Sequence, residues 1–372
     1  TFFETLAEAV LSTGTGAVDA TEITIIGEGN VVNGAGVVIE GQNVIIDLNG
    51  KTYNVINPTV GSPGTETNAF QMKKGSTVVF RNGSIASDVA KILLQNYCDL
   101  TLENVTINAT GSTSIQYIAS NNNGSFTAVG NTQQIAGAGQ VAFDVYYNLG
   151  GSYPDGVTVT FGEDFTGKVV GAVEYGYDVA TDNWQDKTVL NISGGKFDIT
   201  ISPSGTTAQD ANINISGGDF TQAFDGAYLA SDAVLYPTAD GAFAVADQAT
   251  AEQETIGVAQ IGQVIYETLA DALAAAQDGD EIDLLTNISA PGAINITNDI
   301  TLDFNGHAID SDRTIAIVID GANANIISTG ARGTLNTPAN GISVINGSNV
   351  EISDIDIYTE IYILKKDDGS QQ

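Results

Sequence analysis

Short strand-like runs recur along this chain every 22 to 24 residues, and this period constrains the fold more than any other feature of the sequence. The runs carry alternating apolar residues and are separated by glycine and asparagine. The matched positions are Ile85 with Ile107, Ile192 with Ile215, and Ile327 with Glu351. One coil of a parallel β-solenoid, with about three strands of a few residues each, has such a length. We therefore expect each matched pair to lie on neighbouring stacked strands.

Glycine and asparagine also mark the corners that such a coil needs. Asn-Gly pairs stand at 49–50, 82–83, 123–124, 305–306 and 346–347. Glycine adopts a positive φ without steric cost, and asparagine tolerates it while bonding its own backbone. The segments "ISGGKF" and "ISGGDF" place a double glycine before Phe197 and Phe220, respectively. We expect an abrupt corner at each, followed by an inward-facing aromatic ring.

A longer repeat is superimposed on this short period. The segments "FFETLAEAVLS", from residue 2, and "VIYETLADALAAAQDGDEIDLL", from residue 264, both place Glu-Thr-Leu-Ala before a short amphipathic stretch. Thr5 is followed three residues later by Glu8, and Thr268 by Asp271. This spacing is typical of a helix N-cap and its reciprocal acidic partner. The sequence therefore predicts one short helix at the start of each copy.

The same strand and corner follow both helices. "NVIIDLNGKTYNV" at 43–55 matches "DITLDFNGHAIDS" at 299–311, so that Asp47 aligns with Asp303. The only histidine, His307, aligns with Lys51. We interpret this position as one that requires a polar residue after an Asn-Gly corner, rather than imidazole chemistry. Asp47 and Asp303 are expected to bond the backbone of that corner.

The order of these landmarks indicates a head-to-tail duplication, with a first copy at 1–250 and a second copy at 251–372. Residues 109–156, rich in Asn, Ser, Gly, Gln and Tyr, are expected to form an irregular insertion, which is either a long excursion from the solenoid or a set of irregular coils. Residues 221–250 are expected to form a closing turn and a hairpin before a linker rich in Ala, Gln and Glu. The first copy lacks the "AQIGQV" that precedes the helix of the second, and the second ends early. We expect that both ends were cut from a longer array and that the second copy is truncated.

Charge and composition exclude several classes of function. The chain has 45 Asp and Glu residues against 12 Lys and Arg, a net charge of −33. Nucleic acid and anionic lipid would be repelled, so no nucleic-acid partner is expected. No apolar stretch approaches the roughly 18 residues of a membrane span, and no membrane insertion is expected. The single cysteine, Cys98, lies in a strand-like run and is interpreted as a buried structural thiol.

A polysaccharide lyase on such a fold would need clustered carboxylates holding calcium beside a basic side chain. The best local cluster is Arg313 with Asp310 and Asp312. The first copy has Val55, Ile56 and Asn57 in the corresponding region, so an ion pair beside a turn explains the cluster as well.

A hydrolase would need two or three carboxylates separated by about the width of a water molecule. The candidate pairs are Asp47 with Asp88, and Asp303 with Asp310. "DGDEID" at 278–283 lacks the spacing of an EF-hand and is expected to end a helix and begin a strand. The sequence therefore assigns no catalytic, cofactor-binding or metal residue, and no cofactor is expected.

Several of these segments together resemble a known family. "DGDEIDLL", "ITLDFNGHAI", "ISGGKF", "ISGGDF" and "AYLASDAVLYPTADGAFAVAD" resemble large repetitive surface proteins of gut-type Gram-positive bacteria. Their modules are similar to the right-handed parallel β-helix of the pectate-lyase superfamily. The resemblance covers most of the chain and is weakest over 109–156. It implies an all-β, right-handed parallel β-helix with short N-terminal capping helices, in tandem units.

The resemblance implies a non-enzymatic structural or adhesive module at an extracellular cell surface. A glycan, a host or cell-surface protein, and neighbouring modules of a longer array are then the expected partners. Two alternatives remain open on the same fold: a polysaccharide lyase or hydrolase, and a phage fibre or other virion protein.

Overall fold

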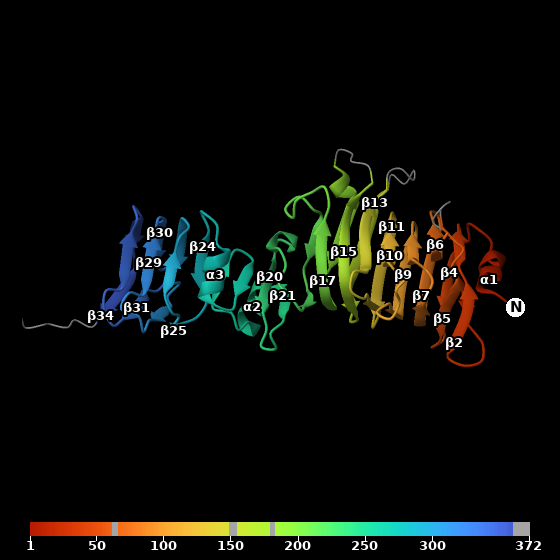
Figure 1. Cartoon of the computed structure of the whole chain (residues 1–372), viewed down its shortest axis with the longest axis horizontal. Helices are drawn as coiled ribbons and strands as arrows, with labels where there is room; N and C mark the ends of the chain where they lie inside the picture. Colours follow the sequence, from red (N-terminus) through yellow and green to blue (C-terminus); the bar gives the residue numbers. More distant parts are fainter. Residues whose placement is uncertain (62–65, 149–154, 179–182, 360–372) are drawn as a thin grey trace, which may run out of the picture. The chain divides into compact units, whose positions relative to one another are not determined.

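The structure, a computed structural model, describes residues 1–61, 66–148, 155–178 and 183–359. Within these residues the chain is mainly β, with three short helices: α1 (Leu6–Ser12), α2 (Gln248–Glu254) and α3 (Leu269–Ala275). Two 3-10 turns, η1 (Trp184–Lys187) and η2 (Gly226–Tyr228), complete the helical part. The chain divides into two compact units: unit 1 is Thr1–Ala233 with Ala242–Asp247, and unit 2 is Val234–Gly241 with Gln248–Gln372. Figure 1 shows the strands of each unit stacked side by side.

Parallel strands of unit 1 pair in three successive ladders. The first contains β1 (Thr21–Thr24), β4 (Asn43–Asp47), β7 (Thr77–Ala86), β9 (Asp99–Asn108), β11 (Gly124–Gly130), β14 (Val157–Phe165), β16 (Thr188–Ile192) and β18 (Ile213–Ile215). The second contains β2 (Val31–Ala35), β5 (Thr52–Asn57), the later parts of β7 and β9, β12 (Gln133–Ile135), β15 (Lys168–Tyr177), β17 (Lys196–Pro203) and β19 (Gly218–Phe220). The third contains β3 (Val37–Glu40), β6 (Asn68–Lys73), β8 (Ile92–Asn96), β10 (Tyr117–Asn121), β13 (Val141–Tyr147) and the later parts of β15 and β17.

Unit 2 repeats this arrangement over fewer strands. One ladder contains β24 (Glu281–Leu284), β27 (Ile300–Asp303), β30 (Asn323–Ile327) and β33 (Asn349–Ile352). Another contains β25 (Ile288–Ser289), β28 (Ala308–Asp310), β31 (Gly333–Thr337) and β34 (Ile355–Thr359). The last contains β26 (Ile294–Ile296), β29 (Ile317–Asp320) and β32 (Ile342–Ile345). Parallel ladders repeated in this way are compatible with an all-β solenoid.

Alternation along many of the strands produces the core, as β9 illustrates. Leu100 and Leu102 are buried, while Asp99 before them is exposed and Thr101 between them is half-buried. Asn104 has a φ of 53°, and the buried side chains resume beyond this corner. One long strand thus serves two ladders, because an asparagine in the left-handed region turns the chain between them.

The expected helix caps are present. Thr5 and Glu8 form a reciprocal capping box at α1. At α3 the Thr268 side chain accepts a hydrogen bond from the Asp271 N–H at 3.1 Å. The Asp271 carboxylate accepts a hydrogen bond from the Thr268 hydroxyl rather than from the Thr268 backbone N–H, since aspartate is one methylene shorter than glutamate. The double-glycine corners also have the expected result: Phe197 and Phe220 are buried and stacked, with ring centroids 5.2 Å apart.

Of the two alternatives for residues 109–156, the long excursion was wrong over the part that the structure describes, where the strands form coils with local register shifts. Residues 117–147 form β10 to β13 in register with the ladders, and 149–154 lie outside the described residues. Polar side chains here satisfy one another inside the stack: Asn96 donates from Nδ2 to Asn121 Oδ1 at 3.1 Å. Asn121 in turn donates to the carbonyl oxygen of Asp144 at 2.9 Å. A polar sequence was therefore mistaken for a loop because the asparagines are stacked rather than solvated.

The three predicted residue pairs are correct in two cases and wrong in one. Ile192 pairs with Ile215, and Ser84 pairs with Thr106, which places Ile85 level with Ile107. Glu351 instead pairs with Asn325, two positions before Ile327. The coil from Asn325 to Glu351 has 26 residues, two more than the expected 24. Because the pairing is displaced by two positions, the alternation of inward and outward side chains is preserved.

The end of the first copy contains the turn η2, the strands β20 and β21, and then α2. β21 (Phe243–Asp247) pairs antiparallel with β19 in unit 1. β20 (Ala233–Pro237) pairs with β23 (Val264–Tyr266) through Leu235 and Val264 in unit 2. The expected linker forms α2. In the described part of the chain, no helix is long and apolar enough to cross a membrane.

Candidate functional sites

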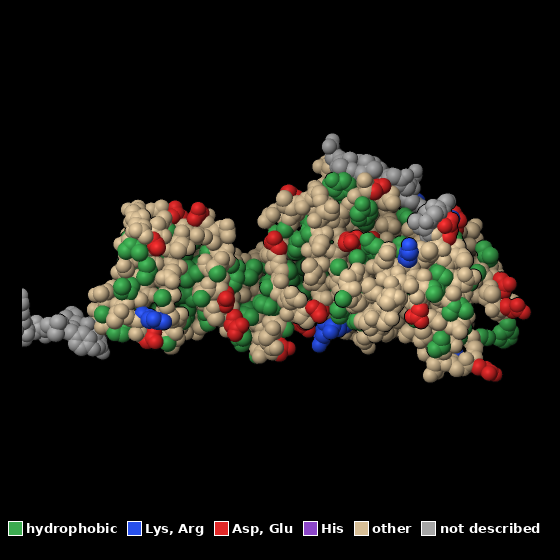
Figure 2. All heavy atoms as spheres, viewed as in Figure 1, with side chains coloured by type: hydrophobic (Ala, Val, Ile, Leu, Met, Phe, Trp, Pro, Cys, Tyr) green, Lys and Arg blue, Asp and Glu red, His purple; other side chains and the backbone are tan. Residues whose placement is uncertain are grey.

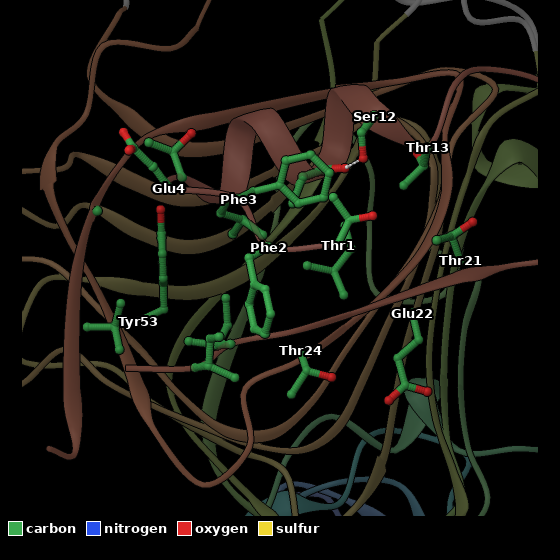
Figure 3. A pocket seen from close by; sticks show the side chains of 18 of the residues that line it. Thr1, Phe2, Phe3, Glu4, Ser12, Thr13, Thr21, Glu22, Thr24 and Tyr53 are labelled. Atoms are coloured by element: carbon green, nitrogen blue, oxygen red, sulfur yellow. Dashed lines mark hydrogen bonds between the residues drawn. The ribbon is translucent and has the colours of Figure 1, made fainter. Parts of the chain in front are cut away.

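A pocket of about 410 Å³ lies beside α1 and the first strands of unit 1. Its walls come from residues 1–5, from α1, and from β1, β2 and Tyr53 of β5. Figure 3 shows Phe2 in the middle of the pocket, between Tyr53 on one side and Thr21 and Glu22 on the other. Phe2 is 87% exposed and Phe3 is 43% exposed. The pocket therefore presents two large aromatic side chains to solvent.

Polar groups at this pocket are held by contacts within unit 1. The Tyr53 hydroxyl donates to the carbonyl oxygen of Ala35 at 2.9 Å, and burial raises the pKa of Tyr53 to about 12. Glu22 accepts an ion pair from Arg81 at 3.1 Å. The phenol and this carboxylate are thus engaged, and the pocket is better suited to apolar contact and strand pairing than to proton transfer.

A second candidate is the acidic corner where β24 meets β27 in unit 2. Carboxylate oxygens of Glu281, Asp283 and Asp303 lie within 4.8 Å of one another. Asp283 pairs directly with Asp303 in the ladder. Burial, followed by the charges of Glu281 and Asp303, raises the pKa of Asp283 to about 6.

The corresponding corner of unit 1 contains an arginine. Arg81 donates from Nε to Asp47 at 2.9 Å and forms an ion pair with Glu22. Burial acts to raise the pKa of Asp47, but hydrogen bonds from Asn49, Arg81 and Asn82 together lower it below its ordinary value. In unit 2 the partner of Asp303 on the next strand is Ile327, where Asp47 has Arg81. The second copy thus keeps the acidic groups without the arginine.

The acidic corner offers few free ligand atoms for a metal ion. Asp303 accepts from the Asn305 N–H at 2.7 Å, from the Thr329 N–H at 2.9 Å and from the Thr329 hydroxyl at 2.7 Å. Calcium takes about six to eight oxygen ligands. With Asp303 engaged in the corner, Glu281 and Asp283 are the carboxylates left to bind a cation. These residues alone do not form a calcium cage.

The missing arginine predicts a stabilising substitution. Ile327→Arg is expected to raise the free energy of unfolding of unit 2 by about 1 kcal/mol, because a guanidinium would neutralise the acidic corner. Thermal unfolding would measure the gain, and titration would show a lower pKa for Asp283. Ile357→Arg, an apolar-to-arginine change at a 40% exposed position on another ladder, is the matched control. Equal effects of the two substitutions would contradict the prediction.

A buried polar network on β10 and β13 is the third candidate. Asp144 is 3% exposed and accepts a hydrogen bond from the Ser120 hydroxyl at 2.9 Å and another from the Asn121 N–H. Next to it in the ladder, Glu174 accepts from the Tyr117 hydroxyl at 2.8 Å. Burial raises the pKa of Asp144 to about 7, against the hydrogen bonds that lower it. The network orders adjacent strands, and its central carboxyl is closed to solvent.

Asp144 should make the stability of unit 1 depend on pH. Its pKa of about 7 lies above the roughly 3.9 of an unfolded aspartate, so the folded state binds the proton more tightly. The free energy of unfolding is therefore expected to rise as pH falls from 8 towards 5, by on the order of 2 kcal/mol. Denaturant unfolding at each pH would show a flatter profile for Asp144→Asn. Parallel profiles for the two proteins would count against this assignment.

The structure disperses the clusters considered from sequence. Arg313 and Asp312 form an ion pair with 3.8 Å between Nε and Oδ1, and both side chains are more than half exposed, at 60% and 68%. Asp310 instead accepts a hydrogen bond from Asn336. Asp88 is exposed, whereas Asp47 is bonded to its corner and to Arg81. Asp303 and Asp310 belong to different ladders of unit 2.

Remaining positions behave as corner or core residues. Cys98 is buried, and burial raises the pKa of its thiol far above the ordinary range. The backbone of His307 closes the corner, accepting from the Thr334 N–H at 3.1 Å, as Lys51 accepts from the Ser84 N–H at 2.9 Å. In "DGDEID", α3 has ended by Ala275 and β24 begins at Glu281, as expected.

Sequence reasoning missed Asp144, Glu174 and the Glu281–Asp283 part of the acidic corner. Alternate acidic residues on β24 ahead of Asp303 were a usable signal for the corner once the two strands were paired.

Comparisons with known proteins found no family model, curated protein or solved structure that matches this chain.

Proposed function

We propose that the chain is a structural or adhesive module, non-enzymatic and extracellular, of a bacterial envelope protein, built as right-handed parallel β-helices in tandem. One observation carries this proposal: the features that recur in both units are structural devices. Each unit has a capped helix, a parallel ladder and an aspartate whose carboxylate accepts the N–H of the asparagine two residues on. The distance is 2.8 Å for the Asn49 N–H and 2.7 Å for the Asn305 N–H. Duplication of such devices extends a stack without multiplying a reaction centre.

The distribution of charge supports the same function. On the face seen in Figure 2, carboxylates occur at many separate places on the surface rather than around one hollow. A net charge of −33 keeps such a module soluble and resists unspecific association. A glycan or a cell-surface protein is the proposed ligand of the adhesive role, with neighbouring modules as structural partners.

A glycan array probed with the full chain, with and without calcium, tests this function together with an assay for polysaccharide cleavage. Binding without cleavage would support an adhesive module, and neither binding nor cleavage a structural one. Cleavage by the wild-type chain would overturn the proposal. Such activity would then be assigned by comparing Asp310→Asn, Asp312→Asn and Arg313→Gln with the Asp144→Asn variant.

A further inference from the structure

The described pairings of the first parallel strand differ between the two units, although their first helices and corners match. In unit 2 the first parallel strand, β24, is covered by β22 (Ala259–Ile261), which pairs antiparallel with it through Ala259 and Leu284. β22 also forms a hairpin with β23, turning at Gly262, which has a φ of 54°. The same hairpin packs against α3. The first strand of unit 2 therefore has a partner on both edges.

The corresponding strand of unit 1 is β1. Glu22 pairs with Ile45, as Glu281 pairs with Thr301, and Asp47 and Asp303 fix the alignment. Among the described pairings, β1 has one partner, β4. Its other edge faces the pocket, because all four residues of β1 line it. The pocket thus lies beside α1 and β1, where unit 2 places β22 beside α3 and β24.

Burial shows the consequence of the open edge. Alignment of Thr5 with Thr268 places Phe2 at the position of Ile265. Phe2 is 87% exposed, but Ile265, which lies on β23 and pairs with Gln260 of β22, is 1% exposed. Just after β1, the side chain of Ile26 is 56% exposed. Its counterpart Leu285, just after β24, is held by the segment before β22, since the Leu285 N–H donates to the carbonyl oxygen of Val258 at 2.9 Å. Phe2 and Ile26 are therefore exposed at a surface that β22 and the residues before it cover in unit 2.

We propose that this edge of unit 1, formed by β1, Phe2 and Phe3, is an acceptor site for an uncharged β-strand of the kind that β22 provides in unit 2. The added strand would pair antiparallel with β1 and cover Phe2. This inference deepens the proposed structural function, since it names the contact by which a neighbouring module attaches. Exposed strand edges with apolar flanks are the usual templates for such pairing.

The charges of the pocket select the chemistry of the partner. Glu4 and Glu22 line it, and a net charge of −33 repels acidic segments. The segment 256–266, which covers the equivalent edge in unit 2, contains no charged residue. An uncharged strand with aliphatic residues at alternate positions fits both the walls and the field of this pocket.

The test adds a strand of this kind before Thr1. A copy of residues 256–263 is placed directly before Thr1, since Gln263 precedes Val264, the counterpart of Thr1. Hydrogen exchange of the β1 amides is compared in the extended and original chains. We expect exchange to slow at least roughly 10-fold in the extended chain, as pairing protects backbone amides from solvent.

The control is the same extension with Ala259→Asp and Ile261→Asp in the copied segment. The proposal is overturned if the unaltered extension leaves exchange in β1 unchanged, or if both extensions slow it equally. Added as a separate peptide, the segment 256–263 should give the same protection at high concentration. If neither the peptide nor the fused form protected β1, the proposed site would also be overturned. Glycan cleavage would refute the proposed function while leaving this exchange result unaffected.

Discussion

Replacing Phe161 with alanine is expected to lower the free energy of unfolding of unit 1 by about 3–5 kcal/mol. Phe161 is fully buried on β14 and forms the centre of an aromatic cluster. Its ring centroid lies within 5.0 to 5.9 Å of those of Phe126, Phe143, Phe165 and Phe197. Alanine would leave a cavity at a point where several successive coils meet, and strands paired on both sides cannot collapse to fill it.

The only tryptophan of the chain gives a direct measurement of this loss. Trp184 is buried in unit 1, so its fluorescence during denaturant unfolding reports on that unit. Phe2→Ala is the matched control, because it removes the same side chain from a position that is 87% exposed. Its effect should stay within about 0.5 kcal/mol. Similar midpoints for the two variants would show that the cluster is not central to the stability of unit 1.

Sequence reasoning succeeded where one residue type has one local task. Asp47 and Asp303 were expected to bond a corner, and each accepts the N–H of an asparagine two residues on. Asn49 and Asn305 adopt positive φ, at 54° and 48°. Thr5 and Thr268 cap helices as predicted. These features depend on neighbours within a few residues, so the local sequence contains the information.

Features that depend on the length of each coil were missed. Ile327 was paired with Glu351, but the true partner of Glu351 is Asn325, since the coil between these two residues is longer than the 24 residues that were assumed. Asp144 was not noticed because its burial depends on Ser120, which is 24 residues away, and on cover from other segments. The acidic corner required the pairing of Asp283 with Asp303. Such sites become visible only once the register is known.

Gly83→Ala and Gly333→Ala are each expected to destabilise their own unit by about 2–3 kcal/mol. A Cβ on Gly83 would lie 2.5 Å from the Cβ of Leu48 and 2.5 Å from the carbonyl oxygen of Lys51. A Cβ on Gly333 would lie 2.5 Å from the Cβ of Phe304. Leu48 and Phe304 occupy the same place in the two corners, so both glycines are required by the stacking of the next coil onto the corner, rather than by positive φ.

Hydrogen exchange with residue resolution distinguishes the two variants. Gly83→Ala should raise exchange rates in β4 and β7 of unit 1, and Gly333→Ala in β27 and β31 of unit 2, because each clash pushes apart the strands on either side of a corner. Gly111→Ala is the matched control, since a Cβ there has no neighbour within 4 Å. If all three variants behaved alike, the glycines would not be corner contacts. Equal losses at the two corners, with Gly111→Ala unchanged, would establish that both copies use one corner design.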